Sequence, residues 1–335
     1  MNIEKKVKSL ASLGNSILNI IDNDEDIINQ ACSRNPWFVQ EFIHKAIYGI
    51  SYMLEEEKLE TWISKYQINK DDKLNIGIIM AGNIPLVGFH DLITVLLSGN
   101  QAIIKLSHND DILIPYIVKL LTSIDPDFGN QVFFRDSIDN VHAVIATGSD
   151  NTARYFKYAF KHIPHIIRKN RTSCGIIDGK EREDEIKQLG DDIFSYFGLG
   201  CRNVSKIYIP KNFKIHDLHS YFNTYNWILK HSKYNNNYRY LKSKYPLENK
   251  SFIDAGFFTL LENEDLVSPI SCVYYEMYDD LKDLKLILEK EKSKIQCIVS
   301  RGGWFPESLA FGKAQRPELW DYADNVDTMT FLESL

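Results

Sequence analysis

LNIGIIMAGNIPLVGFHDLITVLLSGNQAIIKL, residues 74–106, is the stretch of sequence that decides the fold. It opens on a short, nearly continuous apolar run at 74–80, which is typical of a strand buried on both faces. A turn at 81–85 leads into a segment of helical period. SGN (98–100) closes that helix before a second apolar run at 101–106. Strand, helix and strand in this order predict a parallel sheet with a right-handed crossover.

The same alternation continues on both sides of this stretch. Residues 110–123 have helical period, VHAVIAT (141–147) has the apolar character of a third buried strand, and DNTARYFKYAF is helical. Residues 1 to about 70 place apolar side chains at helical spacing. Within them, Asn35-Pro36 predicts a helix start, with asparagine as the N-cap and proline at the first helical position. The first half of the chain is therefore expected to be helices followed by an α/β sheet.

The second half is also mixed in character. Its apolar runs predict further strands, at 173–178, 204–210, 270–278 and 295–300. An aromatic-rich stretch between the second and third of these runs is expected to be helical. Asn235-Asn236-Asn237 predicts a surface turn inside it. No repeat and no low-complexity linker separates the two halves.

Composition narrows the class of protein. The 335 residues carry a net charge of −6 without a basic block, which argues against a nucleic-acid partner. No apolar stretch approaches the roughly 20 residues of a membrane-spanning helix, and the first residues lack the apolar core of a signal peptide. The five cysteines form no CxxC pair, so reduced thiols in the cytoplasm are expected.

Several common motifs are missing from the sequence. There is no GxGxxG after a strand, no P-loop and no HExxH. His162 and His165 flank a proline without a third ligand nearby, which favours an incidental pair, so no metal is expected.

Cys201 is the strongest candidate for chemistry. It lies in YFGLGCRNVSKIYIP, between a helix and a strand, where Gly198 and Gly200 allow a substrate to approach the backbone. Arg202 is adjacent, and a nearby cation lowers the pKa of a thiol. A buried structural thiol is an equally good interpretation of the local sequence alone. The other four cysteines lie in apolar patterns that favour a structural role.

Three polar positions follow apolar strands and therefore lie where open α/β sheets bind ligands. Asn83 comes after the first strand, and its amide could stabilise an oxyanion, although a simple turn or cap is favoured locally. Lys105 ends the second strand, where a lysine usually just meets solvent. Gly148 and Ser149 begin a helix after the third strand and could bind an anion, with helix capping as the alternative.

In this order, the segments resemble the aldehyde dehydrogenase superfamily. The resemblance is closer to the acyl-CoA reductase family that includes the fatty-acid reductase subunit of bacterial bioluminescence. The segments that carry it are AGNIPLVGFHDLITVLLSGNQAIIKLS, ATGSDNTARYF, IIRKNRTSCGIIDG, YFGLGCRNVSKIYIP and FGKAQRPELWDYADNVDTMTFL. The chain is shorter than typical members, mainly in its N-terminal part.

The resemblance implies an α/β fold of two domains, with a Rossmann-like parallel sheet and an active site in the cleft between the domains. The expected boundaries are 1–172 for the N-terminal helices and the cofactor domain, and 173–322 for the catalytic thiol domain. Residues 323–335 are expected to pack back on the body.

The resemblance also assigns roles to residues. Cys201 matches the catalytic thiol, and Asn83 matches the asparagine that binds the oxyanion. The cofactor contacts that it implies are Lys105 at the adenosine ribose, Gly148 and Ser149 under the pyrophosphate, and Asp265 at the nicotinamide ribose. Ser107 and Thr147 are further residues expected to bind the cofactor.

Two departures from the superfamily pattern refine this expectation. Hydrolytic members carry a glutamate base about thirty residues before the thiol, whereas residues 151–177 here contain no acid. An acyl-enzyme would then exchange with an external thiol rather than with water. In addition, His108 stands where NAD-specific members often place a glutamate that repels a 2′-phosphate. NADP(H) is therefore preferred, and NAD(H) stays an alternative.

The expected function is the NADPH-dependent reduction of a fatty acyl-CoA, or of an acyl-carrier thioester, to the aldehyde. Two alternatives remain. One is an NAD(P)-dependent aldehyde dehydrogenase that oxidises aldehydes, and the other is an idle scaffold for an acyl-activating partner. A second copy of the chain and an acyl-transferring protein both stay open as partners.

Overall fold

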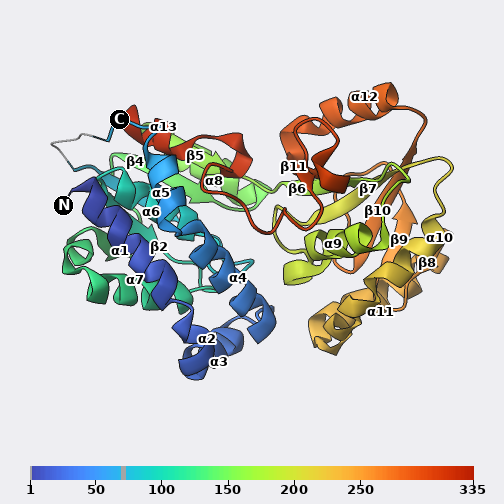
Figure 1. The fold of residues 1–335 in the computed structure, drawn as a ribbon, viewed down its shortest axis with the longest axis horizontal. Helices are drawn as coiled ribbons and strands as arrows, with labels where there is room; N and C mark the ends of the chain where they lie inside the picture. Colours follow the sequence, from blue (N-terminus) through green and yellow to red (C-terminus); the bar gives the residue numbers. More distant parts are fainter. Residues whose placement is uncertain (1, 69–72) are drawn as a thin grey trace. The chain divides into compact units, whose positions relative to one another are not determined.

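The computed structural model describes residues 2–68 and 73–335, except for the side chains of residues 22, 216 and 217. It divides into two compact units, Met1–Asn170 with Pro317–Leu335 (unit 1) and Arg171–Arg316 (unit 2). The chain leaves unit 1, forms unit 2 and returns to unit 1 (Figure 1). Each unit is built around its own sheet, which confirms the α/β class that the sequence predicts.

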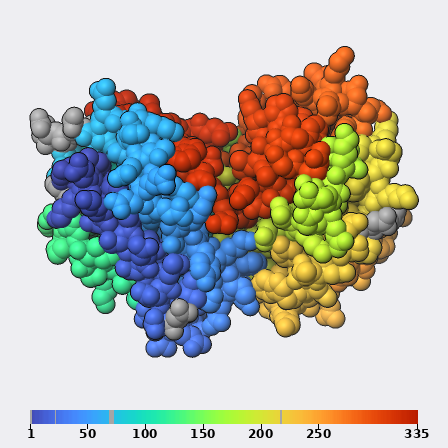
Figure 2. All heavy atoms as spheres, viewed as in Figure 1, coloured from blue at the N-terminus to red at the C-terminus, as the bar shows by residue number. Residues whose placement is uncertain are grey.

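Unit 1 begins with helices, as the helical spacing of its apolar residues predicts. Leu10 and Leu13 on the first helix and Ile43 and Ile47 on the fourth are fully buried or nearly so. In the space-filling view, the blue and light-blue helices form one continuous surface of the unit (Figure 2). Residues 69 and 70, which the prediction included, lie outside the described residues. The helices are α1 (Ile3–Ser16), α2 (Asn19–Asn23), α3 (Glu25–Arg34), α4 (Gln40–Met53) and α5 (Glu56–Ile63).

The predicted helix start at Asn35-Pro36 is wrong, because α4 begins at Gln40 with Val39 as its N-cap. Asn35 is buried, and its side chain makes other bonds. Its Oδ1 accepts the Trp37 N–H at 2.9 Å, and its Nδ2 donates to the Gly82 carbonyl oxygen at 3.0 Å. Asn35 therefore closes a turn and bonds that turn to the loop after the first strand. Local capping rules do not predict either contact.

The sheet of unit 1 has five parallel strands in the order β3-β2-β1-β4-β5. Successive strands run outward from β1 to β3, and the chain then returns to place β4 on the other side of β1. This is the strand order of dinucleotide-binding α/β sheets, whose ligands lie where the order reverses. The strands are β1 (Asn75–Ile79), β2 (Gln101–Lys105), β3 (Val132–Phe134), β4 (Ala143–Thr147) and β5 (His165–Arg168).

Helices connect these strands, and the last residues of the chain add one more. Pro115 lies within the first turn of its helix, where the missing N–H costs nothing. The helices are α6 (Phe89–Leu97), α7 (Leu113–Ile124), α8 (Asp150–Ala159) and α13 (Thr328–Glu333), with single 3₁₀ turns at Pro126–Asn130 and Ala323–Asn325.

Unit 2 contains a seven-stranded sheet in the order β12-β11-β6-β7-β10-β9-β8. All of its strands are parallel except β8, which pairs antiparallel with β9 at one edge. The strands are β6 (Thr172–Ile176), β7 (Val204–Pro210), β8 (Phe252–Asp254), β9 (Thr259–Glu262), β10 (Cys272–Tyr278), β11 (Ile295–Ser300) and β12 (Leu309–Ala310). The helices are α9 (Glu183–Phe194), α10 (Ile215–Leu218), α11 (Ser232–Leu247) and α12 (Leu281–Glu291), with 3₁₀ segments at Ser195–Gly198, His219–Lys230, Lys292–Lys294 and Arg301–Gly303.

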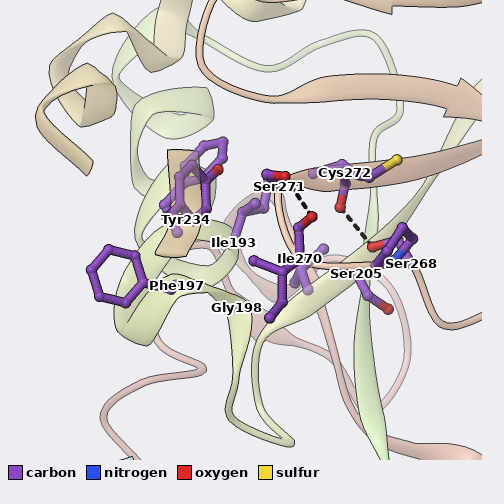
Figure 3. Close-up of a pocket in the computed structure, with 13 residues that line it drawn as sticks. Ile193, Phe197, Gly198, Ser205, Tyr234, Ser268, Ile270, Ser271 and Cys272 are labelled. Atoms are coloured by element: carbon purple, nitrogen blue, oxygen red, sulfur yellow. Dashed lines mark hydrogen bonds between the residues drawn. The ribbon is translucent and has the colours of Figure 1, made fainter. Parts of the chain in front are cut away.

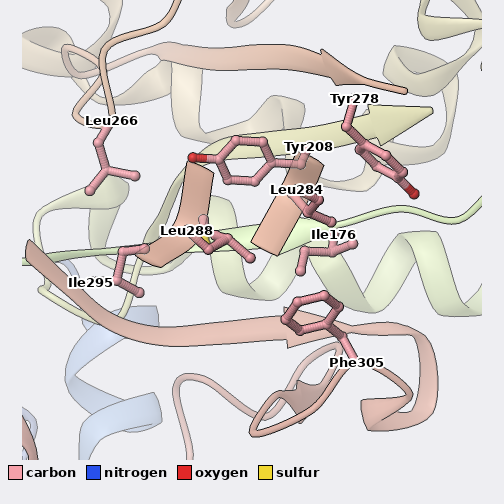
Figure 4. Close-up of a cluster of buried hydrophobic side chains, with 9 residues drawn as sticks. Ile176, Tyr208, Leu266, Tyr278, Leu284, Leu288, Ile295 and Phe305 are labelled. Atoms are coloured by element: carbon pink, nitrogen blue, oxygen red, sulfur yellow. The ribbon is translucent and has the colours of Figure 1, made fainter. Parts of the chain in front are cut away.

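One face of this sheet packs its apolar side chains against α12 (Figure 4). Ile176 from β6 and Tyr208 from β7 are fully buried beside Leu284 and Leu288 of the helix. Burial of such side chains stabilises the fold by about 1.5–3 kcal/mol each. The central strands are therefore fixed, and the loops at their ends start from rigid positions.

The predicted turn at Asn235–Asn237 is wrong, because these residues lie inside α11. Tyr234, Tyr238, Leu241 and Tyr245 recur at helical spacing and are all buried. Burial of this stripe outweighs the weak helix propensity of three asparagines on the other faces.

Within the described ranges, no helix combines the length and apolarity that crossing a bilayer requires.

Candidate functional site

The carboxyl ends of the unit 1 strands carry six of the residues singled out in the sequence. Lys105 is the last residue of β2, and Thr147 is the last of β4. Asn83 follows β1, and Ser107 follows β2. Because the strands are parallel, these ends share one edge of the sheet. Gly148 and Ser149 directly follow β4 at the same edge.

The loop that carries Asn83 packs closely against the loop after β2. A Cβ on Gly82 would lie 2.6 Å from the Ser107 Oγ, so only glycine fits there without a shift. The Asn83 side chain is exposed beyond this contact, and Lys105 is exposed as well. Asn83 and Ser107 are therefore brought close at the edge between β1 and β2.

A buried carboxylate shapes the far end of the same loop. Leu86 has a φ of 61°, a left-handed conformation that a leucine rarely adopts. Its N–H donates to Asp110 Oδ2 at 2.7 Å, and Asp110 is 4% exposed. Burial raises the pKa of Asp110 to about 7, partly offset by the backbone N–H groups that it accepts.

Gly148 and Ser149 form the start of α8, as the sequence predicts. The Ser149 Oγ accepts the Thr152 N–H at 3.3 Å and caps the helix. A Cβ on Gly148 would lie 2.9 Å from the Thr152 Cβ, so the close approach requires glycine. α8 has ten residues, and the N–H groups of its first turn are directed out of its N-terminus. This end of a helix favours an anion.

Asp265 belongs to unit 2. It is exposed on the connection between β9 and β10, and its N–H donates to Asn263 Oδ1 at 2.8 Å. Its neighbour Leu266 accepts a hydrogen bond from Ser205 at the start of β7.

Cys201 lies in a tight turn just before β7, and it is half-buried. Three consecutive residues before the turn, Tyr196, Phe197 and Gly198, have positive φ angles of 52°, 56° and 78°. For two aromatic residues this is a costly backbone conformation, which persists only where the surroundings enforce it. The chain is thereby bent sharply out of α9 toward the thiol.

Asn203 is the main anchor of this turn, and the sequence prediction missed it. The residue is 1% exposed. Its Nδ2 lies within 2.8–3.3 Å of three carbonyl oxygens, those of Asp192, Ile193 and Ser195, and its Oδ1 accepts the Gly200 N–H at 2.8 Å. One buried amide therefore joins the end of α9 to the residue before the thiol.

Ser173 of β6 holds the other side of the turn. It is fully buried, and its Oγ donates to the Cys201 carbonyl oxygen at 3.1 Å. The Ser173 Oγ also accepts the Cys297 N–H at 3.2 Å and lies 3.1 Å from the Cys297 Sγ. Ser173 thus connects the thiol turn to β11, and the sequence offered no signal for it beyond its place in a predicted strand.

Asp192 ties a distant segment to the same region. It is fully buried, and its two oxygens accept the N–H groups of Gly312 and Ala314 at 2.6 and 3.0 Å. The FGKAQRP segment, which carried part of the resemblance, is therefore bound to the helix that leads to Cys201.

A small pocket of about 50 Å³ lies beside the thiol turn (Figure 3). Gly198 and Val204, which precede and follow Cys201, contribute to its wall together with Tyr234 of α11. The Tyr234 hydroxyl is buried without a hydrogen-bond partner in the described part of the chain. A space of this size holds little more than a water molecule or two, so it does not accommodate a fatty acyl chain.

Among the described residues, no cluster of three or more histidine, cysteine, aspartate or glutamate side chains is placed to hold a metal ion.

A family model described as acyl-CoA reductase (LuxC) matches residues 3–300, which is most of the chain. The chain belongs to this family. It is accordingly an oxidoreductase that acts on acyl groups, reducing an acyl-CoA thioester to the aldehyde. No curated protein matches the sequence.

Solved structures similar to this acyl-CoA reductase are aldehyde dehydrogenases. One is described as a putative aldehyde dehydrogenase from Burkholderia cenocepacia, with a TM-score of 0.66 and 12% identity over 90% of this chain and 74% of the other. Another, from Mycobacterium tuberculosis in complex with NAD⁺, has a TM-score of 0.66 and 12% identity over 94% and 76%. The NAD⁺ complex from Bacillus cereus has a TM-score of 0.61 and 13% identity over 90% and 72%. At these identities the likeness shows the fold alone, and it confirms the predicted aldehyde dehydrogenase-like α/β fold.

Proposed function

We propose that this acyl-CoA reductase forms an acyl-enzyme on Cys201 and reduces it to the aldehyde with NADPH. The observation that supports this most directly is the anchoring of the Cys201 turn by two buried side chains, Asn203 and Ser173. A nucleophile held in this way loses little freedom on reaction. Arg202 adds a neighbouring positive charge that favours a thiolate.

In the proposed reaction, the Cys201 thiolate attacks the carbonyl carbon of the thioester. The bond from that carbon to the CoA sulfur breaks, CoA leaves as its thiol after taking up a proton, and the acyl group remains on Cys201. A reduced nicotinamide, when bound, supplies a hydride to this carbon. The resulting thiohemiacetal releases the aldehyde and returns the Cys201 thiolate.

We assign Asn83 to the oxyanion that develops in both steps. Its amide is exposed and lies on a loop fixed by the Gly82–Ser107 contact, where it would donate to a substrate oxygen. Donors of this kind are worth about 3 kcal/mol in other acyl-transfer enzymes. Asn83→Ala is expected to lower kcat by roughly a hundredfold on that basis.

Release by hydrolysis is disfavoured in this proposal. The β6 side chains that bond the thiol turn are Thr172 and Ser173, and residues 151–177 contain no carboxylate. Without a base in this segment, water is not activated against the acyl-enzyme, which argues against an aldehyde dehydrogenase that makes free acid. Steady formation of acid without CoA would favour that alternative. An idle scaffold would instead leave Cys201 unreactive toward acyl-CoA.

The unit 1 sheet fits a nicotinamide dinucleotide. The reversal of strand order between β1 and β4 lies next to the start of α8, and the Gly148 position leaves no room for a side chain. Ser149 and the α8 N-terminus would hold the pyrophosphate, and Thr147 would border it. Lys105 and Ser107 at the end of β2 would meet the adenosine ribose. Asp265 is assigned to the nicotinamide ribose.

The preference for NADPH rests on His108, which is exposed and carries no negative charge to repel a 2′-phosphate. The test compares kcat/KM for NADPH and NADH in the wild type and in His108→Glu. The preference is supported if kcat/KM of the wild type is higher with NADPH than with NADH and if this difference shrinks in His108→Glu. A wild-type kcat/KM that is higher with NADH assigns the site to NAD(H).

The acyl-enzyme can be tested without turnover. The protein is incubated with an acyl-CoA in the absence of nicotinamide, digested and examined by mass spectrometry. The proposal predicts an acyl mass on the Cys201 peptide and none on Cys32, a half-buried thiol of unit 1. An unmodified Cys201 peptide would contradict it.

The same assay can compare acyl-CoA with an acyl-carrier-protein thioester as the donor. A second copy of the chain and an acyl-transferring protein both stay open as partners. We place the protein in the cytoplasm, because five cysteines without a CxxC pair suit a reducing compartment.

A further inference from the structure

Two half-buried thiols lie on either side of one buried hydroxyl in unit 2. Cys201 belongs to the turn before β7, and Cys297 belongs to β11. β6 lies between β7 and β11 in the sheet, and its Ser173 contacts both sides. The proposed reaction uses Cys201 alone, so Cys297 has no role in it.

The contacts place the backbone of the Cys201 turn beside the Cys297 thiol, with the Ser173 hydroxyl bonded to both. The Ser173 Oγ lies 3.1 Å from the Cys201 carbonyl oxygen and 3.1 Å from the Cys297 Sγ. Ser173 and Cys297 both lie where the register between β6 and β11 shifts. The Cys297 N–H donates to the Ser173 Oγ there. An irregular pairing of this kind bends the strand locally and leaves part of the ladder unpaired.

The electrostatic surroundings separate the roles of the two sulfurs. The pKa of Cys297 is raised to about 11, mainly by burial; Arg202 and Ser173 oppose this rise, and Asp192 and Cys201 add to it. At neutral pH, Cys297 is therefore a protonated thiol and a poor target for an oxidant.

We propose that Cys201 and Cys297 are an oxidative modification site, at which a peroxide converts the pair into a reversible disulfide. The proposal rests on the proposed function in taking Cys201 as the reactive thiol. It adds that the same site is switched off by oxidation and restored by reduction.

The chemistry balances with the peroxide as the two-electron oxidant. The Cys201 thiolate attacks one peroxide oxygen, the O–O bond breaks, and Cys201 becomes a sulfenic acid as hydroxide or an alkoxide leaves and takes up a proton. The Cys297 sulfur then attacks the Cys201 sulfur, the S–O bond breaks, and water leaves with the thiol proton. Two thiols have lost two electrons, and an external dithiol returns them by exchange.

The remaining cysteines are poor partners for this reaction. Cys174 is fully buried, and burial raises its pKa well above the ordinary value. Cys272 is 5% exposed and lies in β10, while Cys32 belongs to unit 1. Cys297 is therefore the thiol best placed to resolve an oxidised Cys201 before irreversible oxidation follows.

The test treats the whole protein with limiting hydrogen peroxide, blocks free thiols with N-ethylmaleimide and maps the peptides by mass spectrometry. The expected result is a peptide pair that joins Cys201 to Cys297 and disappears after dithiothreitol. Cys201 oxidised to sulfinic acid without a linked pair would overturn the proposal. This measurement needs no variant.

Cys297→Ser, with Cys32→Ser as its matched control, supplies the second measurement. After peroxide and then dithiothreitol, the share of Cys201 that iodoacetamide can alkylate is expected to be about fivefold lower in Cys297→Ser than in the wild type or the control. Equal recovery in all three proteins would overturn the proposal. Alkylation and peptide mapping do not depend on turnover, so a protein inactive with acyl-CoA would count against the proposed function while leaving this result readable.

Discussion

Two buried side chains, Asp110 and Asn203, hold the loops that carry Asn83 and Cys201. Each bonds backbone groups inside the protein, and leaving such a buried group without a partner costs about 1–3 kcal/mol. Neither side chain is proposed to touch the substrate. Their effects should therefore appear as changes in stability and in the position of the reacting groups.

Asp110→Asn tests the first of these side chains through pH. The pKa of Asp110 is raised from 3.8 to about 7, so the folded state holds its proton more tightly than the unfolded state does. The stability that this proton contributes is complete below about pH 4 and is lost as the pH rises through 7. Asparagine cannot ionise but still accepts the Leu86 N–H.

Urea unfolding at pH 5 and pH 8.5 should show the difference. The free energy of unfolding is expected to fall between these pH values by about 2 to 3 kcal/mol more in the wild type than in Asp110→Asn. Asp136→Asn, at an exposed position, serves as the control and should behave as the wild type. Parallel pH profiles for all three proteins would contradict the raised pKa.

Asn203→Ala tests the second side chain. The change leaves three carbonyl oxygens and the Gly200 N–H without their partner, so we expect a loss of about 1–3 kcal/mol in stability and a slower alkylation of Cys201 by iodoacetamide. Asn237→Ala is the matched control, since Asn237 makes one bond on the exposed face of α11. If the alkylation rate were unchanged in folded Asn203→Ala, the turn would not depend on this amide.

At this scale the sequence indicated Cys201 and Asn83 through local features, a glycine-bounded turn and the end of an apolar strand. It could not indicate Ser173, Asn203 or Asp192. Their importance comes from contacts with residues far along the chain, as between Ser173 and Cys297, which are 124 positions apart. The proposed roles of Cys201, Asn83 and the cofactor residues remain predictions.

At the scale of elements, a buried ion pair joins three parts of unit 1. Arg168 at the end of β5 bonds Asp91 of α6 at 2.5 Å and Thr328 at the start of α13 at 2.9 Å. Both charged residues are at most 6% exposed. Removing one partner of such a pair typically costs about 3–5 kcal/mol, because the other charge stays buried.

Arg168→Met is therefore expected to destabilise the protein by about 3–5 kcal/mol in urea unfolding, and the double variant Arg168→Met with Asp91→Leu should regain at least half of that loss. The apolar pair removes the unpaired carboxylate that the single variant leaves behind. A double variant less stable than the single one would show that the ion pair itself, rather than the buried charge, supports these elements.

The elements that the sequence predicted correctly are those with long apolar patterns, such as β1, β7 and α7. Short strands were missed, because three residues, as in β3 and β8, carry too little periodicity to be recognised. The Asn35 and Asn235–Asn237 errors share a cause, since in both places tertiary burial outweighed a local preference. Capping and turn preferences read from neighbouring residues therefore fail where contacts with distant residues determine the structure.

At the scale of the whole molecule, residues from both ends of the chain complete unit 1. The Trp62 Nε1–H donates to the Tyr322 hydroxyl oxygen at 2.7 Å, and Tyr66 bonds both Tyr322 and Asp327 at 2.8 Å. The Leu319 side chain and the Tyr322 ring are buried in the same unit. The sequence placed the return of the chain at 323, whereas the compact unit already includes Pro317.

Removal of Pro317–Leu335 should therefore unfold unit 1 in preference to unit 2. Limited proteolysis of the truncated chain is expected to cleave first within residues 2–170 and to leave a more resistant fragment from residues 171–316. The full-length chain serves as the control. Equal resistance of both regions after truncation would mean that the C-terminal segment adds little to unit 1.

The central claim, that Cys201 carries the reduction of an acyl thioester, is tested most directly by NADPH oxidation at 340 nm with a series of acyl-CoAs. Wild type, Cys201→Ala and the control Cys32→Ala are compared under reducing conditions. The account predicts acyl-CoA-dependent turnover in the wild type and the control, and a loss of at least about a thousandfold in Cys201→Ala. Full activity in Cys201→Ala would contradict it.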